Sequence, residues 1–441
     1  MKTIIISTTV LILFCSNLSA QCLEPQRDEF GNAIAVKRFT VSPTKTDAEH
    51  VLALSAFAKG TSWKKPNAEA AVLTVFIDGK YNQDIVLYNG DRIFDYKMLL
   101  GRVASGSHLV EIISNPKRSA PTNAKATIRS LNIEPLVVAE LDLVATSNAP
   151  FLSLRRDTID KFSDIPLLTY YEVFTIDEKH RTIRYTTIFT NEDGGTHSEA
   201  LMARWGRMTD IEWVMELETD GDKVRNVRFQ GANHKSTEFH GERIFGAHPA
   251  IYDSTTNNNF ADVGCSQLRT AQVPILVDLT GKSREKAMDE NAFTYRIMAY
   301  EAIREGRINS RKMDTNTIAD PRDYIYAEIY AEPENAAISL KAVAANKMTF
   351  TSDARNKNLR VDRKGYSRIA IYLPRNARTG EFLVSVVCNQ KNEAFNNAIC
   401  KNTKLSEIIT LNKDFLPVVQ RISTTSKNLN GGEKTDIKVR F

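Results

Sequence analysis

The chain has 441 residues, of which 42% are hydrophobic and 25% are charged, with 58 Lys and Arg against 53 Asp and Glu. A disordered chain would contain fewer apolar residues, and a collagen-like chain would contain far more than the 20 Gly and 14 Pro found here. The composition is that of a globular protein, and the length fits two or three domains of about 100 to 200 residues each.

The start of the chain has the pattern of an export signal. Lys2 precedes an apolar run from Ile4 to Phe14, which is too short to cross a membrane. Ala20 is a small residue of the kind that precedes a signal-peptidase cut. We therefore expect residues 1–20 to be a signal peptide, and the mature protein to be secreted to the periplasm or the extracellular space.

Removal of Lys2 would leave 57 basic and 53 acidic residues, a net charge of 57 − 53 = +4. This small excess is not the basic footprint of a nucleic-acid-binding protein. No other stretch approaches the about 18 apolar residues of a membrane helix, so we expect no integral membrane segment in the mature chain. No Asn-x-Ser/Thr acceptor site remains after residue 20, which favours a bacterial source.

Four cysteines remain after the expected cleavage, and an even number fits disulfide pairing in an oxidising compartment. Cys388 and Cys400 bracket eleven residues, and closing a loop of that size contributes about 3 kcal/mol in the chain-entropy model. We predict a Cys388–Cys400 disulfide. The remaining two, Cys22 and Cys265, would then tie the start of the mature chain to its middle.

Residues 21–145 are expected to form an N-terminal β-sandwich. Short runs of β-branched and aromatic residues recur with turn dipeptides such as Asp78-Gly79 and Asn89-Gly90 between them. No helical pattern separates these runs, which is typical of an antiparallel sandwich. The predicted strands cover 71–79, 84–92, 107–114 and 126–135.

A small, polar segment ending in Pro150 marks a boundary, and residues 150–315 are expected to form a central β-rich domain. In a strand over 210–218, Trp213 would share one face with Ile211, Met215 and Leu217, which predicts that it lies in the core. Alternating patterns and turns predict a meander of four strands over 180–190, 196–205, 210–218 and 223–231.

One helix is predicted over 284–305, where apolar residues recur at helical spacing between Ser283 and Gly306. Strand patterns then return and predict a C-terminal β-sandwich over 320–441. The predicted fold is therefore mainly β, with multi-domain antiparallel β-sandwiches, a central β-meander and one helix.

The segment 165–262 holds an unusual density of polar and charged side chains, which makes it the candidate functional site. Charges that alternate along a strand are usually the solvated face of a half-buried sheet, and this interpretation stays open. In a first functional interpretation, two carboxylates across a groove perform acid–base catalysis on a sugar, with Glu199 paired with Asp210 or Glu212.

In a second interpretation the substrate is an acidic polymer. Arg204 and Arg207 would neutralise its carboxylates, while His197 or a tyrosine such as Tyr171 would move the proton. In a third, His234, His240 and His248 would bind a metal with Asp262. The spacing of these histidines matches no known zinc pattern, and the chain has no nucleotide-binding loop, so we expect neither a metal nor a cofactor.

Two features favour a functional site over a solvated sheet face. The run at 203–213 combines two Trp with Arg, Asp and Glu, and aromatic rings pack on the C–H faces of sugars while charged groups bind the hydroxyls. The loop 248–262 is long and rich in amides, and long loops in compact domains are often functional.

We predict four catalytic residues: Glu199, Asp210, Glu212 and His197. The predicted substrate-binding residues are Arg204, Arg207, Trp205, Tyr171, His234 and Asn258. In architecture, the succession of sandwich, meander and sandwich in an exported chain resembles bacterial glycan-active or glycan-binding proteins.

The leading hypothesis is a secreted hydrolase or lyase that acts on an extracellular polysaccharide, an acidic one under the second interpretation. The alternative is a non-catalytic protein of the cell envelope or cell surface that binds a glycan or another protein, and a purely structural subunit is a third class.

Overall fold

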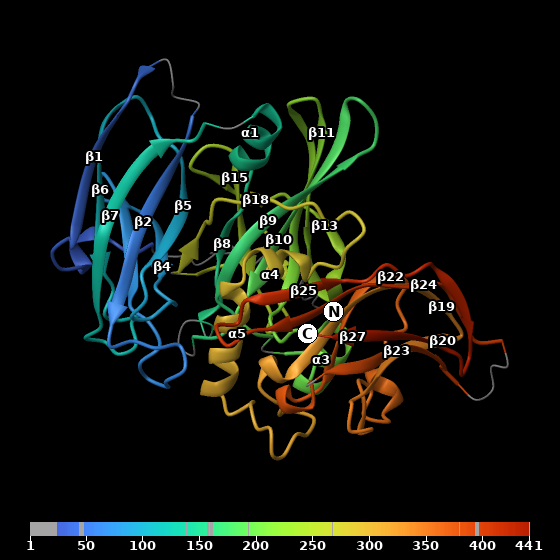
Figure 1. Cartoon of the computed structure of the whole chain (residues 1–441). Helices are drawn as coiled ribbons and strands as arrows, with labels where there is room; N and C mark the ends of the chain where they lie inside the picture. The colour runs from blue at the N-terminus through green and yellow to red at the C-terminus, as the bar shows by residue number, and fades with distance from the viewer. Residues whose placement is uncertain are drawn as a thin grey trace, which may run out of the picture.

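The computed structural model of the chain describes residues 24–440 apart from 44–47, 138, 157, 159–161, 193, 267, 379 and 393–396. The predicted signal peptide lies outside the described residues. Strands account for 48% of the structure and helices for 12%, arranged as several antiparallel sheets, so the predicted mainly-β fold of sandwiches is confirmed. Figure 1 shows the β-rich parts of the chain in blue, in green and yellow, and in orange and red.

The N-terminal part consists of a four-stranded sheet of order β1-β6-β3-β4 and a three-stranded sheet of order β5-β2-β7. At the predicted hairpin dipeptide, Asp78 and Gly79 both have positive φ, which a tight turn between twisted strands requires. The strands are β1 (Ala35–Val41), β2 (Glu49–Lys59), β3 (Val72–Ile77), β4 (Lys80–Val86), β5 (Phe94–Arg102), β6 (Gly106–Ser114) and β7 (Lys125–Pro135).

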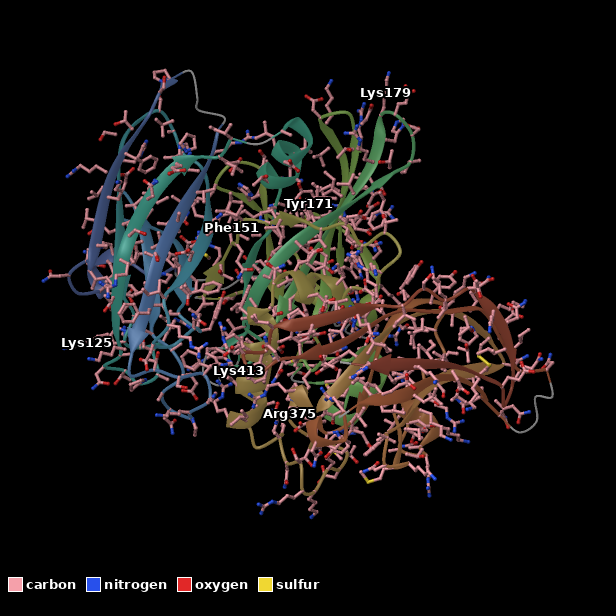
Figure 2. All side chains as sticks on the ribbon, viewed as in Figure 1. Lys125, Phe151, Tyr171, Lys179, Arg375 and Lys413 are labelled. Atoms are coloured by element: carbon pink, nitrogen blue, oxygen red, sulfur yellow. A yellow bond between two sulfur atoms is a disulfide. The ribbon has the colours of Figure 1, made fainter. Side chains whose placement is uncertain are left out.

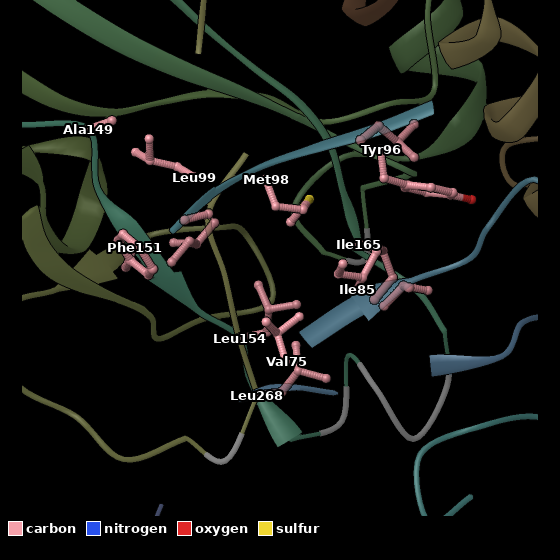
Figure 3. Packing of buried hydrophobic residues seen from close by; sticks show 14 of the residues in the cluster. Val75, Ile85, Tyr96, Met98, Leu99, Ala149, Phe151, Leu154, Ile165 and Leu268 are labelled. Carbon is pink, nitrogen blue, oxygen red and sulfur yellow. The ribbon is translucent and has the colours of Figure 1, made fainter. Parts of the chain in front are cut away.

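The N-terminal and central parts share one hydrophobic core. Met98 and Leu99 of β5 belong to the same buried cluster as Phe151 and Leu268 of the central part, and Figure 3 shows these side chains packed together. A backbone hydrogen bond also joins the two parts, since the Leu99 N–H donates to the carbonyl of Ala271 at 2.8 Å. The two parts therefore hold each other in a defined orientation.

The central part contains a six-stranded sheet of order β13-β12-β11-β10-β9-β18, in which β9 to β13 form an antiparallel meander. Three of the four strands predicted for a meander correspond to β10, β11 and β12. A second sheet, β14-β15-β8-β17 with β16 paired to β15, packs against it. The strands are β8 (Phe151–Ser153), β9 (Pro166–Thr175), β10 (His180–Phe189), β11 (Ile211–Asp220), β12 (Lys223–Gln230), β13 (Ser236–Glu238), β14 (Arg243–Ile244), β15 (His248–Asp253), β16 (Phe260–Ala261), β17 (Arg269–Thr270) and β18 (Ile275–Leu276).

The prediction of a strand at 196–205 is wrong, because this segment forms helix α3 (Ser198–Trp205) between β10 and β11. Its residues include Glu, Ala, Leu, Met and Arg, all strong helix formers. The helix ends at Gly206, whose φ of 63° is the left-handed conformation that a helix C-terminus commonly needs. The apparent alternation of polar and apolar residues concealed this helical propensity.

The prediction that Trp213 lies in the core is also wrong, because it is only half-buried. Tyr185 pairs with Met215 but its neighbour Thr186 pairs with Trp213, so Val214 is an extra residue that forms a β-bulge. The bulge reverses the alternation, and Val214 enters the core together with Met215.

The helical region predicted at 284–305 is divided at Asn291 into α4 (Lys286–Glu290) and α5 (Phe293–Arg304). The Asn291 amide donates to the carbonyl of Ala287, and the Thr294 hydroxyl donates to the Asn291 carbonyl. Such side-chain bonds compete with the helical backbone bonds. With α1 (Glu140–Ser147) and α3, the described residues contain four α-helices where the sequence predicted one.

The C-terminal part is a sandwich of two sheets, β22-β19-β24-β25 with β26 on β24, and β21-β20-β23-β27. The strands are β19 (Tyr324–Glu334), β20 (Ala336–Val343), β21 (Thr349–Thr351), β22 (Gly365–Tyr372), β23 (Glu381–Gln390), β24 (Ile399–Leu411), β25 (Pro417–Arg421), β26 (Lys427–Asn430) and β27 (Lys434–Arg440). The predicted Cys388–Cys400 disulfide is confirmed. Cys265 is also disulfide-bonded, while its predicted partner Cys22 lies outside the described residues.

We predict that Gly206→Ala destabilises the protein more than Gly221→Ala does. Both glycines have φ near +60°, which costs an Ala about 1 to 2 kcal/mol. A Cβ at Gly206 would lie 2.7 Å from Cγ of the buried Arg368, whereas nothing lies within 4 Å at Gly221. Urea denaturation should show an additional loss of about 1 to 3 kcal/mol for Gly206→Ala, and equal losses would contradict the packing described here.

Removal of the second sandwich's cross-link should lower its stability. The double substitution Cys388→Ala and Cys400→Ala is expected to reduce the free energy of unfolding by about 3 kcal/mol, because the unfolded chain regains the entropy of an open loop. Urea denaturation measures the loss. Mass spectrometry of a non-reduced digest is the independent check, and two alkylated thiols in the native protein would refute the cross-link.

Candidate active site

A buried carboxylate, Asp210, lies immediately before β11 and is only 2% exposed. The Asn258 side-chain amide donates to Asp210 Oδ2 at 2.8 Å and to Asp164 Oδ1 at 3.0 Å. One neutral amide therefore bridges two buried acids and donates a hydrogen bond to each. A buried charge is tolerated only when such bonds and nearby cations compensate for lost hydration.

The loop that carries Asn258 is held in shape by its own side chains. Ser254 donates from both its backbone N–H and its hydroxyl to the Asn259 carbonyl, at 2.8 and 2.7 Å. The Thr255 hydroxyl accepts the Asn259 N–H at 3.0 Å. These short-range bonds are typical of Ser, Thr and Asn in tight loops, and they direct the Asn258 amide into the interior. Of the loop predicted over 248–262, residues 248–253 instead form β15 and 260–261 form β16. The amide-rich residues between these strands contribute Asn258 to the candidate site.

Arg155 links Asp164 to a third acid. Its guanidinium contacts Asp164 Oδ2 at 2.8 Å and Asp253 Oδ2 at 3.0 Å. Burial nevertheless raises the pKa of Asp253 to about 7, because the loss of hydration outweighs the attraction of Arg155. Asp253 Oδ1 and Asn258 Oδ1 are buried without a hydrogen-bond partner among the described residues, so the cluster offers unused polar atoms.

The negative charge of Asp210 repels the ionised forms of both Glu192 and Glu212. Burial, and then repulsion from Asp210, raise the pKa of Glu192 to about 7 and that of Glu212 to about 8. Arg207 opposes both shifts. We call Asp164, Glu192, Asp210, Glu212 and Asn258 the acidic centre. Near neutral pH it combines carboxyl groups that keep their protons with a neighbouring negative charge, which is a pattern found in acid–base catalysts.

Glu212 lies at the partly open side of the acidic centre. Its side chain is 15% exposed, and its Oε2 accepts a hydrogen bond from the Gln230 amide at 2.8 Å and lies 3.7 Å from His234 Nδ1. The exposed His234 in turn lies 2.9 Å from the side-chain amide nitrogen of Asn257. Glu212 therefore has a titratable neighbour at the surface.

Glu192 lines a surface groove of about 470 Å³, within the size range of small-ligand pockets. Gly195 borders this groove, and a Cβ there would lie 2.5 Å from Asn257 Oδ1 and 3.3 Å from Glu192 Oε1. Asn257 therefore lies near this edge of the groove, and its amide nitrogen also contacts His234. The remaining lining residues include His197, Ser198, Glu305, Arg307 and Asn316. We call this the Glu192 groove.

The structure brings four of the ten predicted site residues together, namely Asp210, Glu212, Asn258 and His234. His197 lies in the adjoining Glu192 groove, where its Nδ1 is 3.0 Å from Asn316 Oδ1. Glu199 lies two residues further on, in the first turn of α3, and burial followed by the charge of Asp314 raises its pKa. Arg207 pairs with the buried Glu285 at 2.9 Å and compensates charge behind the acidic centre.

Arg204 and Trp205 lie apart from the acidic centre, at the opposite end of α3. The guanidinium groups of Arg204 and Arg363 lie 4.9 and 5.0 Å from the Trp205 ring, and Arg204 contacts Asp362 at 3.4 Å. Trp205 is therefore stacked between cations of α3 and the C-terminal part rather than open as a platform for sugar rings.

Tyr171 is buried in the core of the central part, where its hydroxyl donates to Asp142. Figure 2 shows it among packed side chains, in contrast to Lys179 at the tip of the β9–β10 hairpin. Burial, followed by that hydrogen bond, raises its pKa. A buried tyrosine that keeps its proton is a poor candidate for binding a substrate from solvent.

Sequence reasoning did not identify Glu192, Asp164 or Arg155. Glu192 belongs to a turn-like run, 191–195, which predicts a hairpin and no chemistry. Asp164 and Arg155 precede both the predicted meander, which begins at residue 180, and the predicted functional segment, which begins at residue 165. Their only local signal is the density of acids and Arg between 155 and 164.

The three histidines considered as metal ligands do not share a site. His248 is buried against Glu49 at 2.9 Å, His240 contacts Glu238 at 3.9 Å, and His234 adjoins Glu212. Among the residues that the structure describes, no group of three or more His, Cys, Asp or Glu side chains is arranged to hold a metal ion. In the same part of the chain, no helix has the length and apolar character needed to cross a membrane.

Comparisons with known proteins do not assign the chain to a family. No protein-family model matches it, and no curated protein matches it. A comparison with solved structures finds the C-terminal domain of EclA, described as a sugar-binding protein, at 16% identity over 24% of this chain and 69% of that chain. The TM-score is 0.19, so this match carries no argument.

We predict that ionisation of Glu212 destabilises the fold as the pH rises. Its pKa is raised from 4.5 to about 8 in the folded protein, so the folded state binds this proton more tightly than the unfolded state. Stability from this group is complete below about pH 4.5 and is lost as the pH rises through about 8.

Urea denaturation at about pH 5 and about pH 9 tests this prediction. Glu212→Gln, which cannot ionise, should gain stability relative to the wild type at the higher pH only. The control is Glu218→Gln, which changes an exposed carboxyl on the same strand. A Glu212→Gln difference that does not change with pH would contradict the raised pKa.

Proposed function

We propose that the protein is a secreted enzyme that cleaves an extracellular polysaccharide by general acid–base catalysis in the Glu192 groove. The observation that carries the proposal is the pair of carboxyl groups with raised pKa values, Glu192 and Glu212, beside the buried Asp210. Titratable groups that adjoin a groove and whose pKa values are shifted towards neutral pH are characteristic of catalytic sites.

Glycosidic cleavage requires one group to protonate the leaving oxygen and another to remove a proton, either from water in hydrolysis or from the sugar in elimination. Glu192 is suited to the first role because its pKa of about 7 leaves much of it protonated near neutral pH. His197 lies in the same groove and is exposed, so it is suited to accept the other proton. Asp210 acts through its charge on Glu192 and is a positioning residue.

Arg307 gives the Glu192 groove a cation for substrate binding. Its Nε donates to the Ser198 hydroxyl at 3.0 Å, and its Nη1 lies 3.2 Å from Glu305. A guanidinium fixed on one edge can bind a sugar hydroxyl or a carboxylate. This residue therefore accommodates both a neutral and an acidic polysaccharide, and hydrolysis and elimination both remain within the proposal.

The alternative is a non-catalytic glycan-binding protein. The observation that favours it is burial, because Asp210 is 2% and Glu192 is 9% exposed. In such a protein the buried acids would have a structural role only. Arg307 and His197 would bind a glycan without its being cleaved. Activity measurements distinguish these two functions.

We predict that Glu192→Gln lowers kcat about 10²- to 10⁴-fold while the protein stays folded, because the amide cannot donate a proton to the leaving oxygen. Glu218→Gln, on the exposed face of β11, should retain full activity. The assay is a polysaccharide panel with the purified mature protein, followed by reducing-end release and by absorbance of unsaturated uronates. Activity should also fall as the pH rises through about 7, where Glu192 loses its proton.

Binding of a glycan by the wild type without any turnover across the panel would favour the alternative. Unchanged turnover in Glu192→Gln would remove Glu192 from the mechanism.

A further inference from the structure

A second groove, of about 480 Å³, lies where the segment 282–286 meets β24, β25 and the residues that follow β25. Its charged lining consists of four basic side chains and one acidic one, a net charge of 4 − 1 = +3. Ser406, Ser423 and Thr424 add hydroxyl groups. We call it the basic groove, and its charged residues are Lys282, Lys286, Lys404, Arg421 and Glu407.

Two of the four cations in the basic groove are already paired. Lys282 Nζ lies 2.6 Å from Glu407 Oε1, and Lys286 Nζ lies 3.7 Å from Glu290 Oε1. Lys404 and Arg421 are exposed, and no acidic side chain of the described residues lies within ion-pair distance of either. Two like charges on one groove wall attract an anion of complementary shape.

Glu407 faces the basic groove because of a β-bulge. Glu328 pairs with Glu407 and Ile329 with Leu405, so Ser406 is an extra residue on β24. Leu405 and Ile408 are three residues apart, yet both belong to the C-terminal core. The bulge reverses the alternation between them, and Glu407 turns away from that core towards Lys282.

One oxygen of Glu407 is left without a donor. The residue is 6% exposed, and its Oε2 is buried with no hydrogen-bond partner among the described residues. A buried carboxylate oxygen without a donor is costly. A ligand could donate an O–H to this oxygen while its own negative charge contacts Lys404 and Arg421. Such a ligand would provide a partner both for the oxygen and for the two cations.

We propose that the basic groove binds a sugar residue that carries both a negatively charged group and a free hydroxyl. The charged group would contact Lys404 and Arg421, and the hydroxyl would donate to Glu407 Oε2. A neutral sugar would leave the two cations unpaired. This inference rests on the proposed function and extends it, because it names the substrate class as an anionic glycan.

The segment 282–286 joins the basic groove to the acidic centre. Lys282 and Lys286 line the groove, whereas Arg284 donates to the Ile211 carbonyl at 2.6 Å, next to Asp210 and Glu212. The charge of Asp210 also attracts Arg284. An anionic chain bound in the groove would therefore lie against the same short segment that supports the acidic centre.

The test is calorimetric binding of polygalacturonate, with its fully methyl-esterified form as the same backbone without charge. The double variant Lys404→Ala and Arg421→Ala should bind polygalacturonate about tenfold or more weakly than the wild type, because two charge-assisted contacts are lost. The control variant Lys413→Ala and Lys427→Ala removes two exposed lysines outside the groove and should bind like the wild type. Dextran sulfate against dextran provides the arm for a sulfated sugar.

Equal binding by the double variant and the wild type would overturn the inference, as would wild-type binding that does not prefer either charged polymer over its uncharged counterpart. Preference for dextran sulfate with the same loss in the double variant would support it for a sulfated sugar. The proposed function is judged separately. If Glu192→Gln keeps its turnover while the double variant loses binding, the acid–base mechanism fails and the anion site stands.

Discussion

The burial of one carboxylate, Asp210, is the constraint on which the central part of the molecule depends. Its charge has little hydration, so the surrounding chain supplies compensation from several elements: the Asn258 amide from the loop after β15, and Arg207 and Arg284 as nearby cations. The compensation is incomplete, and the burial of Glu192 and Glu212, followed by repulsion from the Asp210 charge, raises the pKa values of both groups. The same imbalance that costs stability supplies the proton-carrying groups proposed for catalysis.

A chain of buried ion pairs continues from this centre into the C-terminal sandwich. Arg207 pairs with Glu285, and the fully buried Arg368 pairs with Asp289 and with Glu328, which also accepts bonds from Ser283. Removing one member would leave its partner as an uncompensated buried charge, which is strongly destabilising. The network therefore holds the segment before α4 in one position, and that segment contributes both to the acidic centre and to the basic groove.

Helix α3 explains why the predicted site residues separate into two groups. A strand would have placed His197, Glu199, Arg204 and Trp205 along one sheet beside Asp210. The helix instead carries His197 and Glu199 at its start, beside the Glu192 groove, and Arg204 and Trp205 at its end, against Arg363 of the C-terminal part. Only the first end adjoins the acidic centre, so the mixture of Trp and Arg at 203–205 serves the contact between two parts of the fold.

The sequence by itself determined features that depend on neighbouring residues: several strands of both outer sandwiches, the Asp78-Gly79 hairpin, the Cys388–Cys400 disulfide and the amide-rich residues between β15 and β16. Period-two alternation and turn chemistry are local, and they can be read without knowing what packs on them. The tertiary structure alone decided the bulges at Val214 and Ser406, the position of Glu192 beside Asp210, and the assembly of the basic groove from residues 282 to 424. These features arise from the compensation of buried charge and from packing between segments far apart in the chain, and neither leaves a periodic signal in the sequence.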